Sequence, residues 1–143
     1  VEQPVIHNLL CKRIAELWGI RVSPRLQAAV DDALIGSYID MTDSDVQAYW
    51  RTKEASLDYP YYRTNSNRDV SDIPLIEIMN AVRYAVEQQV SIPQADLLRS
   101  ATRLLGFARK GASIESQISR AIQKLISNGV LVENDGIVTS GEK

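Results

Sequence analysis

Hydrophobic residues along this chain recur mostly at helical spacing. In the second half, apolar positions at i, i+3, i+4 and i+7 form stripes bounded by proline, serine and glycine, a pattern that predicts amphipathic helices. We expect three of them, over about residues 75–89, 94–105 and 113–127. Ser113 is expected to be the N-cap of the last helix, because a serine oxygen accepts the free N–H groups of a first turn.

Two short β-branched runs follow the last predicted helix. Residues 130–132 and 137–139 flank the sequence Glu133-Asn134-Asp135-Gly136. Asn and Gly tolerate positive φ, so this arrangement predicts a β-hairpin. Three helices followed by a hairpin is the order of a winged helix, whose third helix normally enters a DNA major groove.

The first half of the chain repeats part of this pattern. The helical stretch 9–19 ends in Trp18-Gly19 as the stretch 96–106 ends in Leu105-Gly106, and both glycines are expected to be left-handed C-caps. A second stripe matches at identical spacing: Leu26, Ala29, Val30, Ala33 and Leu34 correspond to Ile118, Ala121, Ile122, Leu125 and Ile126. The fold is therefore predicted to be mainly α with small β-hairpins, in two tandem winged-helix-like units.

The two predicted copies are unequal. The first lacks a counterpart of the helix over 75–89, which we expect to lie largely before Val1. Ser23-Pro24 is expected to open its second helix, with Ser23 as the N-cap. The predicted organisation is a truncated first copy at residues 1–51, an extended linker without clear period at 52–72, and a complete second copy at 73–143.

The hairpin of the first copy is expected at residues 38–39 and 46–50. Between the two runs, Asp40, Asp43 and Asp45 resemble the start of a calcium-binding loop, but the glycine and terminal glutamate of that loop are missing. A polar hairpin tip is the expected role of these aspartates.

Composition limits the classes of function. The chain has 16 Lys and Arg against 18 Asp and Glu, for a net charge of −2. A dedicated nucleic-acid binder usually has a basic excess, so DNA contact would have to come from a local basic face. No apolar run approaches the roughly 20 residues of a membrane span. The start at Val1 has no basic and apolar leader, which favours a segment of a longer protein over a signal peptide.

The single cysteine and single histidine do not predict a reactive site. Cys11 cannot form an intrachain disulfide and fits a reducing compartment, so a cytoplasmic location is expected. His7 lies four residues before it, on the same helical face, but no further Cys or His completes a metal site. A structural role is expected for both. The chain also has no phosphate-binding glycine motif, so no cofactor and no catalytic activity of its own are expected.

The aromatic residues are divided by the same pattern. Trp18 ends an apolar stripe and is expected in the core. Tyr59, Tyr61 and Tyr62 lie in the predicted linker and suggest that it packs on a surface.

A DNA-contact hypothesis uses the turn before the third predicted helix and the exposed face of that helix. Positive charge near a helix N-terminus adds to the free N–H groups and the dipole, which favour phosphate. The candidates in the second copy are Arg109, Lys110, Ser113, Gln117, Arg120 and Lys124, and those at similar places in the first copy are Arg21 and Arg25. The alternatives are an ordinary solvated helix face and a module that binds protein instead of DNA.

The same residues carry a resemblance to a known family. The motifs are Leu104-Leu105-Gly106-Phe107, the turn Arg109-Lys110-Gly111-Ala112-Ser113-Ile114 with its helix, Trp18-Gly19 and Ile73-Pro74-Leu75. With these motifs the chain resembles the uncharacterised C-terminal domain of large bacterial superfamily-one helicase-like proteins. The resemblance implies an accessory module in a DNA-processing parent protein, whose motor and nuclease lie outside this segment. It implies DNA and the rest of that parent chain as partners.

Overall fold

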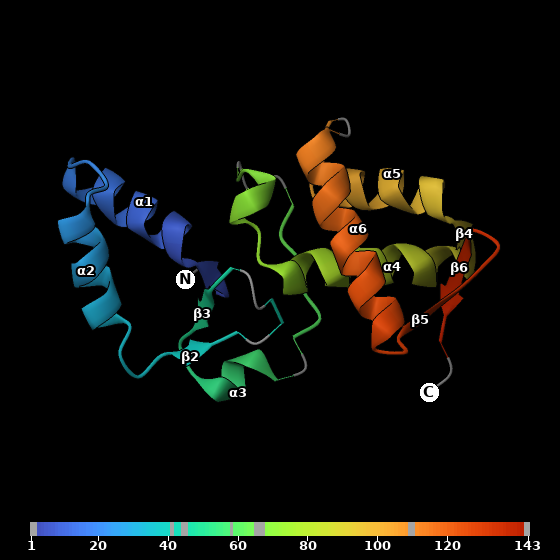
Figure 1. Ribbon diagram of the computed structural model, residues 1–143, viewed down its shortest axis with the longest axis horizontal. Helices are drawn as coiled ribbons and strands as arrows, with labels where there is room; N and C mark the ends of the chain where they lie inside the picture. Colours follow the sequence, from blue (N-terminus) through green and yellow to red (C-terminus); the bar gives the residue numbers. More distant parts are fainter. Residues whose placement is uncertain are drawn as a thin grey trace. The chain divides into compact units, whose positions relative to one another are not determined.

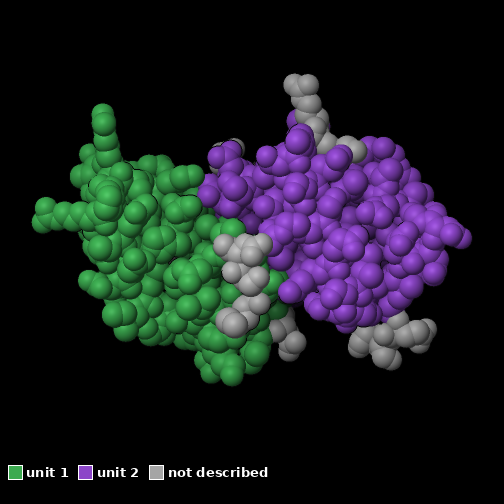
Figure 2. Space-filling view, viewed as in Figure 1, with its two compact units in different colours: residues 1–59 green, residues 60–143 purple. Residues whose placement is uncertain are grey.

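A computed structural model describes residues 3–40, 42–43, 46–57, 59–64, 68–108 and 111–141. The chain divides into two compact units, which we call unit 1 (residues 1–59) and unit 2 (residues 60–143), as Figure 2 shows. Each unit is mainly helical and holds one small antiparallel sheet (Figure 1). No helix among the described residues is both long enough and apolar enough to cross a bilayer.

Unit 1 begins with a short strand and two helices. Its elements are β1 (Val5–Ile6), α1 (His7–Trp18), α2 (Pro24–Ala33), β2 (Tyr38–Ile39), β3 (Ala48–Trp50) and α3 (Lys53–Ser56). The sheet has the order β1-β3-β2, with Ala48 opposite Ile6 and Trp50 opposite Tyr38.

Local chemistry explains the ends of the unit 1 helices. Gly19 ends α1 with φ 64°, in the left-handed region where glycine carries no Cβ penalty. The Ser23 side chain accepts a hydrogen bond from the Leu26 N–H at 3.2 Å, and Pro24 occupies the first helical position. The predicted caps at Gly19 and Ser23 are therefore confirmed.

Unit 2 has the same order of strands and helices behind one additional long helix. Its elements are η1 (Val70–Asp72), α4 (Leu75–Gln89), β4 (Ser91–Pro93), α5 (Gln94–Leu104), α6 (Ala112–Ser127), β5 (Leu131–Asn134) and β6 (Ile137–Ser140). The sheet has the order β4-β6-β5, which matches β1-β3-β2 of unit 1 strand for strand. Asp135 (φ 51°) and Gly136 (φ 77°) form the β5–β6 turn, as the Asn-Asp-Gly sequence predicts.

The bounds of the three predicted helices agree with α4, α5 and α6 within one residue. Two details differ. Gly111 is the N-cap of α6, so Ser113 lies inside the first turn and is exposed, and the expected cap at Ser113 is wrong. The strands β1 and β4 were not expected; each pairs with the hairpin and turns it into a three-stranded sheet.

The segment 52–72 differs from the expected extended linker. It contains α3 and η1, and its C-terminal part is anchored to α4 in unit 2. Asn80 of α4 donates a hydrogen bond to the Tyr61 carbonyl at 2.9 Å, and Arg68 is 5% exposed. Hydrogen bonds to α4 hold this part in place, and it has no hydrophobic period for sequence analysis to detect.

The cores of the two units differ in size. In unit 2, α4 packs against both α5 and α6 in one large buried cluster. In unit 1, the corresponding cluster between α1 and α2 consists of Cys11, Ala15, Leu26 and Val30. No helix among the described residues of unit 1 corresponds to α4.

Two side chains of unit 1 contradict their expected environments. Trp18 is 70% exposed, so its prediction as a core residue is wrong. Its counterpart Leu105 is buried in the core that includes α4, and no helix among the described residues of unit 1 corresponds to α4. Asp40 is buried instead of lying at a polar tip, because its carboxylate accepts hydrogen bonds from the Trp50 indole at 2.8 Å and from the Thr42 N–H at 2.7 Å.

Candidate nucleic-acid interface

Helix α6 is held by its apolar face. Ile118, Ala121, Ile122 and Leu125 are 0–1% exposed and belong to the same core as α4 and α5. Their spacing follows the helical period, so the opposite face of α6 is directed away from the core. Packing of the apolar face thus fixes the position of the helix that carries the polar side chains.

The exposed face of α6 carries the predicted contact residues Ser113, Gln117, Arg120 and Lys124. At about 100° per residue these four positions fall within about 60° of one another around the helix. The acidic residue of α6, Glu115, lies about 140° from Arg120 and about 180° from Lys124 on the same scale. The basic face of α6 is therefore unbroken by carboxylates of its own helix.

The side chains on this face are not equally exposed. Ser113 and Lys124 are exposed, whereas Gln117 and Arg120 are half-buried. Arg120 Nη1 donates a hydrogen bond to Gln117 Oε1 at 2.9 Å. This contact fixes the guanidinium one turn along the helix from Lys124.

The N-terminus of α6 adds positive potential at one end of this face. Gly111 caps the helix without a side-chain hydrogen bond to its first turn, so the dipole is offset there by the Glu115 carboxylate and not by a capping side chain. The predicted contact residues Arg109 and Lys110 lie outside the described residues.

The tip of the hairpin that follows α6 has the opposite charge. Glu133 and Asp135 lie at the β5–β6 turn, and Glu133 Oε2 accepts a hydrogen bond from the Gly136 N–H at 2.7 Å. A carboxylate at this tip repels phosphate. The hairpin tip therefore does not extend the basic side of α6.

The candidates of unit 1 lie in a less favourable setting. Arg21 and Arg25 are exposed, in the α1–α2 connection and the first turn of α2. The same helix carries Asp31 and Asp32, both exposed. Its charges are thus mixed, unlike the face of α6.

Sequence analysis missed an ionic cluster on α4. Glu77 is fully buried and accepts hydrogen bonds from Arg68 at 2.9 and 3.0 Å and from the Arg63 backbone N–H at 3.0 Å, and Arg63 Nη2 forms a further short contact. Burial by itself raises the pKa of Glu77, but the two guanidinium groups outweigh it and lower the pKa below its ordinary value. A lone glutamate inside the apolar run Leu75–Met79 was the available signal.

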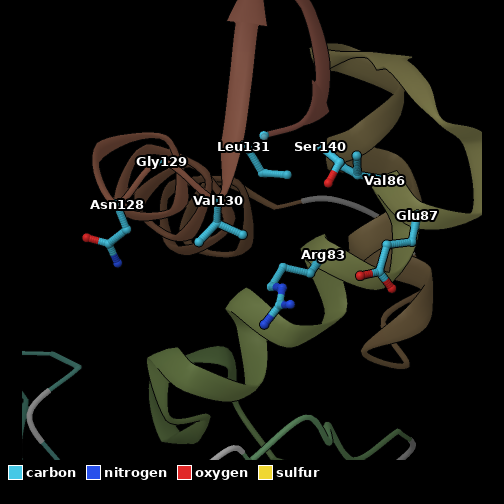
Figure 3. A pocket seen from close by; sticks show the side chains of 9 residues that line it. Arg83, Val86, Glu87, Asn128, Gly129, Val130, Leu131 and Ser140 are labelled. Atoms are coloured by element: carbon cyan, nitrogen blue, oxygen red, sulfur yellow. The ribbon is translucent and has the colours of Figure 1, made fainter. Parts of the chain in front are cut away.

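A groove of about 440 Å³ opens beside the C-terminal half of α4. Figure 3 shows Arg83 and Glu87 from α4 on one side, and Asn128 and Val130 from the α6–β5 turn on the other. The two charges on this wall have opposite signs and are four residues apart, so they give the groove no net preference for an anion or a cation. Its described lining residues include the Ser140 hydroxyl and the Glu87 carboxylate but no histidine, so they do not form a serine–histidine pair.

Unit 1 brings together a cysteine, a histidine and an aspartate. His7 Nε2 lies 2.6 Å from Asp31 Oδ1, and His7 Nδ1 lies 3.9 Å from Cys11 Sγ. Cys11 is 0% exposed, and burial together with the charge of Asp31 raises the pKa of its thiol. A buried, protonated thiol is a poor nucleophile. The contact therefore joins α1 to α2, and the described residues contain no group of three or more metal-ligating side chains.

The chain was also compared with known proteins. It matches no protein-family model, no curated protein sequence and no solved structure. The resemblance to helicase-associated domains stays a prediction from short motifs.

Proposed function

We propose that unit 2 is a winged helix that contacts the DNA backbone through the exposed face of α6. The observation that carries this proposal is the side of α6 with Ser113, Gln117, Arg120 and Lys124, which has no carboxylate from α6 itself, on a helix whose apolar side is fixed in the core. The proposed module is accessory and non-catalytic.

The order of elements supports the winged-helix part. Unit 2 runs helix, strand, helix, helix and hairpin, with the first strand added to the edge of the hairpin. In a winged helix of this order, α5 and α6 are the helix-turn-helix pair and β5–β6 is the wing. Helix α6 then takes the place of the recognition helix.

The charge distribution favours unit 2 over unit 1. Residues 60–143 contain 10 Lys and Arg against 9 Asp and Glu, whereas residues 1–59 contain 6 against 9. Within unit 2, the ionic cluster of Glu77 with Arg63 and Arg68 takes two positive charges and one negative charge out of this count, which leaves 8 Lys and Arg against 8 Asp and Glu. Local charge, not the net charge of the chain, sets attraction to phosphate.

The proposed contacts position the module and carry little sequence information. Arg120 and Lys124 reach phosphate as charged donors, and Ser113 and Gln117 add neutral hydrogen bonds. The acidic tip at Glu133 and Asp135 does not enter the minor groove in this arrangement, because it would face the phosphates that line that groove. Recognition of the backbone without base readout suits an accessory role in a larger helicase- or nuclease-like protein, the parent suggested by the sequence resemblance.

A salt titration tests the proposal. Binding of the whole chain to a labelled DNA duplex is measured by fluorescence anisotropy over a range of salt concentrations. Each phosphate contact contributes about 0.9 to the slope of log K against log salt. The double variant Arg120→Ala/Lys124→Ala is therefore expected to lower the slope by about 2 and to weaken binding at every salt concentration.

The control removes the same charge elsewhere on unit 2. Arg99 and Arg103 are both exposed on α5 and are not among the proposed contact residues, so Arg99→Ala/Arg103→Ala should lower the slope less than Arg120→Ala/Lys124→Ala does. No binding by the unaltered chain at low salt, or equal losses in both variants, would overturn the proposal.

A further inference from the structure

The side chains of Gln117 and Arg120 form a hydrogen-bonded pair on α6. Arg120 Nη1 donates to Gln117 Oε1 at 2.9 Å, and both side chains are half-buried. The two residues are three positions apart, so they are neighbours along the helix surface. Ile118 and Ala121, next to them in the sequence, are 0% exposed and hold this part of the helix in the core. The pair is therefore part of the folded surface in the absence of DNA.

This hydrogen bond determines the orientation of the Gln117 amide. A guanidinium group donates and does not accept, whereas a side-chain amide has one accepting oxygen and one donating NH2 group. The oxygen must face Arg120, because the opposite orientation would bring donors against donors. The NH2 group of Gln117 is then directed away from Arg120, and the oxygen is engaged by the guanidinium.

The other contact residues of α6 also supply donors. The ammonium group of Lys124 only donates, and the Ser113 hydroxyl is able to donate. Both are exposed, on a side of the helix that has no carboxylate from α6 itself. DNA groups that match such a surface are acceptors, namely the phosphate oxygens and, in the major groove, N7 and O6 of guanine.

Adenine does not match this arrangement. A glutamine reads adenine with both ends of its amide, because the oxygen accepts from N6 and the NH2 group donates to N7. In Gln117 the oxygen already accepts from Arg120. The oxygen has a second lone pair, but an adenine N6 group brought to it would meet the donors of the guanidinium.

We infer that Arg120 is a specificity-determining residue, which prevents Gln117 from reading adenine by holding the amide oxygen. The contact residues of α6 are thereby restricted to acceptor groups of DNA. Gln117 in turn is a positioning residue for the guanidinium. The inference rests on the DNA contact proposed for α6 and deepens it, because it explains why the glutamine on this helix adds no preference for adenine.

Releasing the glutamine tests the inference. Arg120→Met keeps an unbranched side chain but removes every donor, so the Gln117 oxygen becomes available to a base. The whole chain is mixed with short DNA duplexes that have a randomised centre, and the bound fraction is sequenced. Arg120→Met should enrich adenine at one position at least about fivefold over the unaltered chain, because a bidentate contact discriminates between bases by at least that factor.

Two further variants control this result. Lys124→Met removes the same charge one turn along α6 and leaves Gln117 bound to Arg120, so it should weaken binding without enriching adenine. In Arg120→Met/Gln117→Met the amide is removed as well, so the adenine enrichment should disappear. In the chain without DNA, the side-chain amide signals of Gln117 in NMR spectra should shift in Arg120→Met and stay unchanged in Lys124→Met.

The outcomes separate this inference from the proposed function. No binding of any duplex by the unaltered chain would overturn both. The inference alone fails if Arg120→Met binds without adenine enrichment, if the enrichment persists in the double variant, or if the unaltered chain already enriches adenine and Gln117→Met abolishes this. It also fails if the Gln117 amide signals do not respond to Arg120→Met, or if Arg120→Met binds no duplex while Lys124→Met does.

Discussion

Units 1 and 2 place the same order of strands and helices around very different cores. Both have a three-stranded sheet in the order first, third, second strand, and both pack two helices against each other. Among the described residues, only unit 2 adds a long helix, and that helix joins α5, α6 and the sheet in one cluster. Equivalent residues are therefore buried in one unit and exposed in the other, as Leu105 (2%) and Trp18 (70%) illustrate. An amphipathic pattern marks the face that a helix offers for packing, and whether that face is buried depends on a separate element.

The two units also differ in which helix face is exposed. In unit 2 the apolar faces of α5 and α6 are used internally, which leaves the polar face of α6 as the surface available for contact. In unit 1 part of the corresponding apolar face is exposed, as Trp18 shows. The same order of elements thus leaves a polar helix side exposed in unit 2 and apolar residues such as Trp18 exposed in unit 1.

The largest expected effect comes from the same substitution at equivalent positions. Ala121→Glu would place an unpaired carboxylate at a 0% exposed site and should destabilise unit 2 by at least about 4 kcal/mol. Ala29→Glu, at the exposed counterpart, should change stability by no more than about 0.5 kcal/mol. Urea unfolding followed by far-UV circular dichroism measures both.

Tryptophan fluorescence tells the two units apart in this experiment, because Trp18 and Trp50 both belong to unit 1. Ala121→Glu should move the circular dichroism transition while the fluorescence transition changes little. Equal destabilisation by the two substitutions would mean that Ala29 and Ala121 do not differ in burial.

The next effect concerns the ionic cluster that anchors residues 60–72 to α4. Glu77→Gln leaves the buried guanidinium of Arg68 without its counter-charge and should cost about 3–5 kcal/mol. The exposed Glu87 on the same helix offers the control, since Glu87→Gln should have almost no effect. Chemical unfolding of both variants decides the point, and a small effect of Glu77→Gln would show that the cluster does not hold the segment.

The same cluster predicts how the stability of unit 2 depends on pH. Because the folded pKa of Glu77 is lowered, its stabilisation is fully present above the unfolded pKa of about 4.3 and is lost as the pH falls through the folded value. Unfolding in urea at a series of acidic pH values should show this loss in the unaltered chain. In Glu77→Gln the loss should be smaller, because glutamine does not titrate.

The smallest expected effect lies at the junction between α4 and β4. Val90 has φ 67° and ψ −53°, a strained conformation for a β-branched residue, and its side chain is 77% exposed. Val90→Gly should stabilise unit 2 by about 1 kcal/mol, because glycine adopts positive φ without a Cβ clash. Val90→Ala keeps the Cβ and should give less gain; an equal gain would show that loss of the exposed side chain, not relief of strain, is responsible.

Sequence periodicity was sufficient for the long elements. The stripes of α4, α5 and α6 and the Asn-Asp-Gly turn gave bounds that agree with the structure within a residue or two. Periodicity did not predict features that depend on a contact with another part of the chain. The burial of Asp40 needs the indole of Trp50, and the two- and three-residue strands β1 and β4 are defined only by pairing with a hairpin.

The candidate site was predictable in part for the same reason. The face of α6 follows from helical spacing, so Ser113, Gln117, Arg120 and Lys124 could be grouped from the sequence. The contact between Arg120 and Gln117 and the hydrogen bond within the acidic hairpin tip depend on side-chain positions and on the fold. The exposure of Trp18 could have been inferred from the absence of a counterpart of α4 in the first predicted copy, because α4 packs in the core that buries the equivalent Leu105.

The most direct test of the central claim compares the charged pairs of the two units in one DNA-binding assay. Arg120→Glu/Lys124→Glu alters unit 2, and Arg21→Glu/Arg25→Glu makes the same change of charge in unit 1. With salt-dependent anisotropy on a duplex, we expect the unit 2 variant to lose binding at all salt concentrations, and the unit 1 variant to lose only a small, nonspecific part at low salt. Equal losses in the two variants, or a larger loss in the unit 1 variant, would contradict the assignment of DNA contact to α6.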